Sequence, residues 1–172
     1  GFALSFTLVA EAQAPKPVTF RSYPRLIMDG SRTPRSGAMA LFERHFQLQA
    51  GDHLVPERKW EDELGYARDR YQQYYRNVKV EGAVYTVHSR NGIIESLSGE
   101  FKGISGLEVT PVIQAMRALQ LAQDHVGAQV YAWEEKVRKG YPDYEKPKGE
   151  LVVIGGSEGD SLPPRLAWKF DN

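Results

Sequence analysis

The sequence predicts an α+β fold made of two sequential units, in each of which a helix packs on an antiparallel sheet. Two observations support this prediction. Residues 65–101 alternate between apolar and polar side chains around two turn signals, which is typical of three antiparallel strands. Residues 104–172 then show a helical pattern followed by two short strand-like runs. We therefore expect two domains along the chain, joined near Lys102–Gly106.

Two short turns set the predicted pairing of the three strands. Asn91-Gly92 suits a two-residue type I′ turn, whose central residues both need positive φ. The other turn is predicted at Arg76-Asn77, because asparagine adopts the left-handed conformation more cheaply than most residues. The predicted cross-strand pairs are Tyr75–Val78, Gln73–Val80 and Tyr71–Gly82 in the first hairpin, and Arg90–Ile93, His88–Glu95, Thr86–Leu97 and Val84–Gly99 in the second.

Alternation along these strands separates a predicted core face from a predicted polar face. Gln73 is the unusual member of the core face, because a buried amide needs hydrogen-bond partners. Tyr85 and Val87 are apolar exceptions on the polar face. The core face consists of Tyr71, Gln73, Tyr75, Val78, Val80, Val84, Leu97 and Phe101, and the polar face of Arg70, Gln72, Lys79, Glu81, Ser96, Ser98 and Glu100.

Ahead of the sheet we expect a connector, a helix and a charged lead-in. Pro15–Pro34 is rich in proline and arginine and is predicted to be extended. Ser36 is predicted to cap a helix that runs to about Gln49 and stops at Gly51. Val55–Leu64 is predicted to be an exposed charged segment that leads into the sheet. The residues that recur at helical spacing are Ala38, Leu41, Phe42, His45 and Leu48.

The second unit is predicted from helix-start and helix-stop residues. Thr110-Pro111 combines a capping hydroxyl with proline at the first helical position, and Gly127 follows a helix predicted to end near His125. Val130–Trp133 is predicted to be a short strand. The helix residues predicted to be buried are Val112, Met116, Leu119, Ala122 and the side of the helix at Val126. The final hairpin is predicted to pair Leu151–Ile154 with Arg165–Phe170.

The stretch from Arg70 to Gly99 resembles the fungalysin/thermolysin propeptide domain. That family has an Arg-aromatic-x-Gln-x-aromatic strand, a turn, Val-x-Gly, and then a strand and a glycine turn that ends in glycine. Asn77 and Arg68 depart from the pattern, because the family usually has glycine and often histidine there. The positions that fit the pattern are Arg70, Tyr71, Gln73, Tyr75, Val80, Gly82, Gly92 and Gly99, and all of them except Tyr75 are taken as its structural signature.

The resemblance also suggests how the chain is divided. Residues 15–103 correspond to the propeptide-like domain. Residues 104–172 are similar to the PepSY-type module that follows it in thermolysin-like precursors, and Leu166–Asp171 matches a strand near the end of that module. The module is therefore expected to be truncated at its C-terminal end. One helix on a curled sheet in each unit is a cystatin-like arrangement.

Residues 1–14 look like the end of a secretory signal peptide. A short apolar run precedes small residues, and cleavage is expected after Ala12, because cleavage after Ala14 would leave Pro15 at the first position beyond the cut. The alternative is an edge strand over residues 2–10. The apolar run is far shorter than the roughly 20 residues that a membrane-spanning helix needs.

Composition excludes several kinds of function. Lys+Arg and Asp+Glu number 22 each, so no net charge attracts nucleic acid or an anionic membrane. The absence of cysteine excludes disulfides and thiolate metal sites. No His-Glu-x-x-His motif is present to bind zinc, and residues 155–159 lack the Lys-Ser/Thr of a phosphate loop. We therefore expect neither a metal nor a cofactor.

Two clusters contain residue types that can carry out or support chemistry. Glu61, Asp62 and Glu63 resemble an acid/base group, but adjacent charges ahead of a strand are more typical of a solvated rim. Tyr71, Tyr74 and Tyr75 could stack on bases, but no basic surface surrounds them in the sequence. The chain is therefore predicted not to be an enzyme.

The resemblance implies a propeptide of a secreted thermolysin-like zinc metalloprotease. Such regions act as intramolecular chaperones and temporary inhibitors of the catalytic domain, which would be the partner in cis. No nucleic acid is expected as a partner, and no membrane after signal removal. Two alternatives stay open: a free-standing secreted cystatin-like binding module with no attached protease, and a small hydrolase that uses Glu61. A downstream His-Glu-x-x-His in the reading frame would favour the propeptide.

Overall fold

The computed structural model describes residues 26–28, 32–46, 48–131, 133–134, 146–155 and 163–170. Within these residues the chain has an α+β fold whose strands all belong to one curled, mostly antiparallel sheet, which confirms the predicted fold class. The predicted signal segment, residues 1–14, lies outside the described residues. The predicted division into two cystatin-like units is not confirmed, because the second hairpin is hydrogen-bonded to the first sheet.

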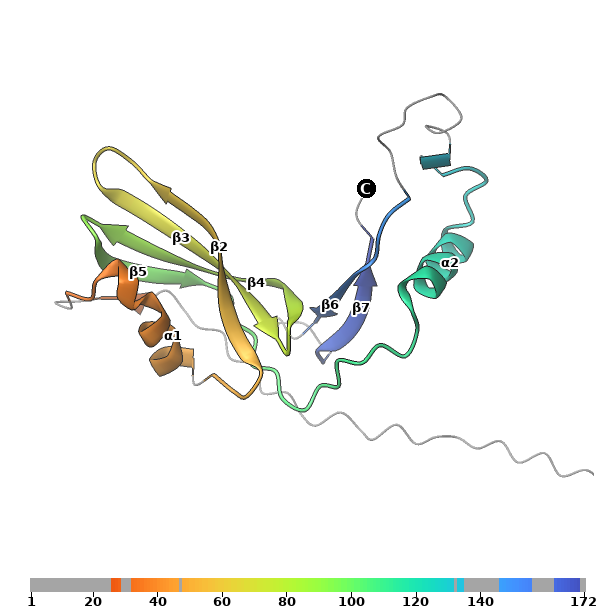
Figure 1. Cartoon of the computed structure of the whole chain (residues 1–172), viewed down its shortest axis with the longest axis horizontal. Helices are drawn as coiled ribbons and strands as arrows, with labels where there is room; N and C mark the ends of the chain where they lie inside the picture. The colour runs from red at the N-terminus through yellow and green to blue at the C-terminus, as the bar shows by residue number, and fades with distance from the viewer. Residues whose placement is uncertain are drawn as a thin grey trace, which may run out of the picture.

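The main part of the sheet has the strand order β1-β5-β4-β3-β2, and β6 pairs with both β4 and β7. Figure 1 shows α1 on one side of strands β2–β5 and α2 beside the β6–β7 hairpin at the other end. The strands are β1 (Leu26–Ile27), β2 (Asp52–Glu61), β3 (Tyr66–Tyr75), β4 (Val78–Arg90), β5 (Ile93–Gly99), β6 (Glu150–Ile154) and β7 (Arg165–Lys169). The helices are the 3₁₀ helix η1 (Arg35–Gly37), α1 (Ala38–Phe46) and α2 (Ala115–Val126).

Two strands lie where the sequence predicted none. The charged segment Val55–Leu64 was expected to be a lead-in, but most of it belongs to β2, which pairs along its length with β3. The predicted extended connector Pro15–Pro34 contributes β1, which pairs with β5. Leu54 is the only fully buried residue of β2. An edge strand that is exposed over most of its length has no apolar alternation, which is why β2 was missed.

Both predicted turns are confirmed. Arg76 and Asn77 have φ of 46° and 66°, and Asn91 and Gly92 have φ of 49° and 76°. Positive φ at both central residues is the requirement of a type I′ turn. The pairs nearest the turns, Tyr75–Val78 and Arg90–Ile93, are the predicted ones.

Beyond the turns, the predicted register of the first hairpin is wrong. Residues 80–83 of β4 bulge away opposite Gln73 alone, so the predicted Gln73–Val80 pair does not form and Tyr71 pairs with Tyr85 instead of Gly82. At the bulge, Lys79 and Val80 pair in parallel with β6. The bulge therefore connects the two parts of the sheet.

A smaller bulge shifts the second hairpin. It falls between His88 and Ser89, so that His88 pairs with Ser96 and not with Glu95. The predicted Thr86–Leu97 and Val84–Gly99 pairs are likewise wrong. The observed pairs are Thr86–Ser98 and Tyr85–Gly99.

The first bulge also changes which side chains reach the core. It adds an odd number of residues to β4, and such a change moves every following side chain to the other face. Tyr85 and Val87, predicted on the polar face, are therefore buried, whereas Val84, predicted in the core, is half-buried. The other predicted core residues are buried as expected: Tyr71, Gln73, Tyr75, Val78, Val80, Leu97 and Phe101.

Helix α1 covers the core face through aromatic contacts. Phe42, with 0% of its surface exposed, meets the edge of the Tyr71 ring at 4.9 Å between centroids. Phe46 stacks on Phe101 at 4.7 Å. The helix is shorter than predicted, because it is assigned only to Phe46, and its last turn buries Phe46 while the predicted His45 is exposed. Ser36 lies inside η1, and no side-chain capping hydrogen bond forms at the start of that helix.

Helix α2 begins later than predicted. Thr110 does not cap it, because its hydroxyl donates to Oε1 of Glu108 at 3.0 Å, and the helix starts at Ala115. The predicted stop is confirmed, since Gly127 has φ of 65° and its N–H donates to the Gln123 carbonyl. Of the residues predicted to be buried, Leu119 is buried, but Val112, Met116, Ala122 and Val126 are exposed.

The remaining predictions for the second unit have mixed outcomes. The final hairpin is confirmed, with Leu151 opposite Trp168. Val130 and Tyr131 do not form the predicted strand, and the Tyr131 ring stacks on Trp133 instead. In the predicted link Lys102–Gly106, Ile104 is buried against the cluster that includes Val80 and Val153. The domain boundary placed there stays a prediction.

Tyr71 was predicted to lie opposite Gly82, but a Cβ at Gly82 would meet only Lys102 Nζ, at 3.8 Å, and so would not clash with Tyr71. The φ of 76° still disfavours other residues. We expect Gly82→Ala to lower the free energy of unfolding by about 1–2 kcal/mol. Gly82→Asn should recover part of that loss, because asparagine tolerates this conformation. Urea denaturation of both variants checks this, and an asparagine variant less stable than the alanine variant would point to a steric clash.

Candidate protein-interaction surface

The signature residues occupy three kinds of position. Tyr71, Gln73 and Val80 are buried in the core. Gly82, Gly92 and Gly99 lie at the first bulge, the second turn and the end of β5, with positive φ at each. Arg70 is exposed, and its Nε donates to Glu57 Oε2 at 2.8 Å. The signature therefore describes mainly how the sheet is built, and only Arg70 presents a charged group to a partner.

Gln73 holds the chain that follows β5 against the sheet. Its Oε1 accepts the Lys102 backbone N–H at 2.9 Å, and its Nε2 donates to the Lys102 carbonyl at 2.7 Å. Nε2 also lies 3.3 Å from Asp52 Oδ1. The side chain is 0% exposed, so these bonds are shielded from water. The predicted need of Gln73 for inward-facing partners is confirmed.

Gln72, which was predicted on the polar face, is buried and fills the first bulge. Its Nε2 donates to the carbonyls of Val80 at 2.7 Å and Ala83 at 3.1 Å. These carbonyls belong to the residues of β4 that separate from β3. The amide therefore replaces the lost ladder bonds, and the adjacent pair of glutamines was the sequence signal for this role.

Asp52 carries a pH-dependent contribution to stability. Burial raises the pKa of Asp52, although hydrogen bonds from Gln49 and Gln73 oppose the shift. The folded chain therefore holds this proton to higher pH than the unfolded chain does, so the contribution favours folding at low pH and is lost as pH rises through the raised pKa. We expect the melting temperature of Asp52→Asn, relative to the original chain, to increase between pH 3 and pH 7. A difference that stays constant or decreases would contradict this assignment.

The acidic cluster predicted as a solvated rim has structural contacts. Glu61 accepts a hydrogen bond from Arg35 Nη1, and Arg35 Nε donates to the buried Asp69 at 2.6 Å. Hydrogen bonding to Asp69 raises the pKa of Arg35, which keeps the guanidinium charged. Asp62 Oδ1 accepts the backbone N–H of Tyr66 at 2.9 Å and closes the β2–β3 turn. Sequence reasoning did not single out Arg35.

The sheet face opposite α1 carries a row of long side chains, and no described helix packs on it. Neighbouring strands place Arg58 opposite Arg70 and Trp60 opposite Arg68. Trp60 and Tyr66 are 45% and 40% exposed. We call this surface the open face; it is formed by Arg58, Trp60, Tyr66, Arg68, Arg70, Thr86, His88 and Arg90.

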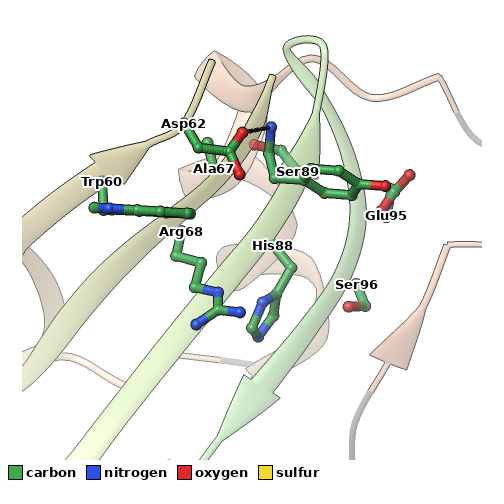
Figure 2. Close-up of a pocket in the computed structure, with 9 residues that line it drawn as sticks. Trp60, Asp62, Ala67, Arg68, His88, Ser89, Glu95 and Ser96 are labelled. Atoms are coloured by element: carbon green, nitrogen blue, oxygen red, sulfur yellow. Dashed lines mark hydrogen bonds between the residues drawn. The ribbon is translucent and has the colours of Figure 1, made fainter. Parts of the chain in front are cut away.

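The open face is shaped around Trp60 and Arg68. The Arg68 guanidinium lies 5.6 Å from the centre of the Trp60 ring, within the range of a cation–π contact. Figure 2 shows the Trp60 ring above the Arg68 side chain, with His88 beside it. Two shallow depressions share Trp60 and Arg68, one extending toward His88 and the other toward Arg58. The pair therefore lines both depressions.

His88 does not form the predicted pair with Glu95. Its Nε2 lies 3.0 Å from the Ser98 hydroxyl oxygen.

Within the described residues, no group of three or more histidine, aspartate or glutamate side chains is placed to hold a metal ion. The same part of the chain contains no helix with the length and apolar character needed to cross a bilayer. The arrangement offers a contact surface and a rigid framework.

The strands that form this framework coincide with a known family model. Residues 52–101, from the start of β2 to the residues just after β5, match the Fungalysin/Thermolysin Propeptide Motif. This chain carries a thermolysin-type propeptide motif. The stated resemblance is thereby confirmed, whereas the PepSY-type resemblance of residues 104–172 stays a prediction.

Similarity to thermolysins extends beyond the propeptide motif. Proteins named thermolysin from Alicyclobacillus acidocaldarius subsp. acidocaldarius, Bacillus caldolyticus and Bacillus sp. (strain EA1) are each 32% identical over 131 residues. The alignment covers 73% of this chain and 22% of each relative, so the chain spans about one fifth of the length of these relatives. The motif is a propeptide motif and not a catalytic domain, in agreement with the prediction that the chain is not itself an enzyme.

Proposed function

We propose that this chain is the propeptide region of a secreted thermolysin-like zinc metalloprotease. In this role it acts as an intramolecular chaperone and temporary inhibitor of the catalytic domain, its partner in cis. The observation that carries the proposal is that the propeptide motif, residues 52–101, coincides with the β2–β5 framework. Export of the precursor agrees with the signal-like apolar run and small residues within residues 2–14.

A scaffold suits the folding of an exported protease. The durability of such an enzyme is set by slow unfolding, because unfolded molecules outside the cell are degraded or aggregate. A high unfolding barrier often accompanies a high folding barrier. A preformed template that binds the folding transition state lowers that barrier and can afterwards be removed.

The framework has the properties that a template needs. Phe42, Phe46 and Tyr85 form an aromatic core between α1 and the sheet. Gln72 and Gln73 fix the bulge and the chain after β5 by buried hydrogen bonds. These interactions fix the shape of the sheet within the chain itself. The template can therefore form before its partner does.

Refolding of the catalytic domain from the same precursor tests the chaperone role. The denatured domain is diluted into buffer with or without an equimolar amount of the 172-residue chain. Peptidase activity is measured when refolding is complete. We expect a higher yield of active enzyme with the chain present. Bovine serum albumin at the same mass concentration controls for general protection against aggregation. Equal yields in the three samples would reject the chaperone role.

The inhibitory role has its own measurement. The chain is added to the native catalytic domain, and the initial rate of peptide hydrolysis is followed as its concentration increases. We expect the rate to fall and then to recover as the protease degrades the chain. If the rate of peptide hydrolysis does not change with the concentration of the chain, the chain is not an inhibitor. The refolding result would not be affected.

A further inference from the structure

We propose that the open face is the surface through which this chain binds the catalytic domain, and that it contacts an acidic patch on that domain. The inference rests on the proposed function and adds to it the binding surface and the charge of the partner. Three properties of the open face support it: it lacks a covering helix in the described part of the chain, it has an exposed aromatic–arginine centre, and three of its four arginines have no carboxylate partner among the described residues.

The centre of the open face has the composition of an interaction hot spot. Tryptophan, tyrosine and arginine are the residues most enriched where protein interfaces gain their binding energy. Trp60 and Arg68 pair across β2 and β3, and the Arg90 guanidinium lies 4.8 Å from the Tyr66 ring centre. These contacts hold the arginines in defined positions without neutralising them. Less side-chain entropy is then lost when a partner binds.

The charge of the open face is not balanced locally. Arg70 forms an ion pair with Glu57, but Arg58, Arg68 and Arg90 have no carboxylate partner among the described residues. The sequence as a whole has equal numbers of acidic and basic residues, so the excess belongs to this surface and not to the chain. Guanidinium groups bind carboxylates through paired hydrogen bonds. An acidic protein surface is therefore the complementary partner.

Other occupants fit less well. A symmetric dimer through this face would bring the facing arginine pair Arg58 and Arg70 close to the same pair of a second copy. A nucleic acid would meet Glu57 and Glu95 at the edges of the face, which repel phosphates. A protein surface can present single aspartate and glutamate side chains to the arginines and leave the two glutamates uncontacted, whereas a nucleic acid carries charge along its whole backbone.

Charge reversal on the open face tests the inference. The double variant Arg58→Glu/Arg68→Glu changes two exposed arginines, and Arg44→Glu/Arg117→Glu makes the same change of net charge on exposed positions of α1 and α2. Binding to the catalytic domain is measured by biolayer interferometry at 50 and 300 mM salt. We expect the open-face variant to bind at least about tenfold more weakly, the control to bind within about twofold of the original chain, and added salt to weaken the original complex.

Further measurements distinguish failure of the open-face inference from failure of the proposed function. Circular dichroism verifies that both variants fold, and Arg68→Gln, which adds no acidic group, provides a milder change expected to weaken binding in the same direction. Equal binding by all variants would overturn the open-face inference and leave the proposed function standing. An original chain that neither binds nor assists refolding would reject the proposed function itself. A dimer in sedimentation that Arg68→Gln dissociates, or tighter binding to a short DNA duplex, would assign the face to another partner and also overturn the inference.

Discussion

Replacing Gln73 by leucine is expected to lower the free energy of unfolding by about 2–4 kcal/mol. Leucine fills similar space but cannot bond to Lys102, whose backbone N–H and carbonyl both depend on the Gln73 amide. Lys102 is itself buried, so water cannot replace the lost partners without opening the structure. Each buried polar group left unpaired costs about 1–3 kcal/mol. The midpoint of urea denaturation, followed by circular dichroism, measures the loss.

Gln120→Leu is the matched control for this prediction. Gln120 is exposed on α2, and its amide donates to Asp124 Oδ1 at 2.8 Å, four residues further along the same helix. Such a pair contributes about 0.2–0.5 kcal/mol, so the control should remain close to the original stability. A Gln73→Leu variant as stable as the Gln120→Leu variant would show that Gln73 does not anchor the chain after β5.

Gly99→Ala is expected to lower the free energy of unfolding by about 2–4 kcal/mol. Gly99 has φ of 150°, and a Cβ there would overlap the Val84 carbonyl oxygen and lie 2.7 Å from the Tyr85 Cα. Both neighbours are backbone atoms of β4, which cannot rotate away as a side chain can. Relief therefore requires β5 to move away from β4. Thermal and urea denaturation both measure the loss.

Gly92→Ala measures the cost of positive φ in the absence of steric overlap. Gly92 has φ of 76°, but a Cβ there would have no atom within 4 Å, so only the backbone conformation opposes alanine. We expect a loss of about 1–2 kcal/mol at Gly92, clearly smaller than the loss at Gly99. Equal losses at the two glycines would mean that the close approach of β4 and β5 at Gly99 can be relieved without cost.

Local chemistry explains which parts of the fold the sequence predicted. The turns at Arg76-Asn77 and Asn91-Gly92 depend on asparagine and glycine, which tolerate positive φ, so each turn can be recognised from two adjacent residues. The bulge at residues 80–83 depends on amides from Gln72 and on pairing with β6, which lies some 70 residues away in sequence. Pattern reasoning assumed uninterrupted pairing and therefore placed Tyr85 and Val87 on the wrong face.

In the helices and the contact surface, too, features set by local residues were predicted and features set by distant contacts were not. The stop of α2 at Gly127 was predicted because glycine alone signals it, whereas the start was misplaced because Glu108 engages the Thr110 hydroxyl. Trp60 and Arg68 become a pair only when β2 lies beside β3, and no periodic signal predicted β2. Gln73 was identified in advance because an amide on an apolar face must find partners.

The central claim is that the chain lowers a folding barrier of its partner, and order-of-addition refolding tests this most directly. The denatured catalytic domain is first diluted without the chain and held until activity stops increasing; the 172-residue chain is then added, and activity is followed again. A template that lowers the barrier predicts a second rise in activity from the stalled soluble material. If late addition restores no activity while addition at the start does, the chain only prevents aggregation, and the account of it as a folding template is contradicted.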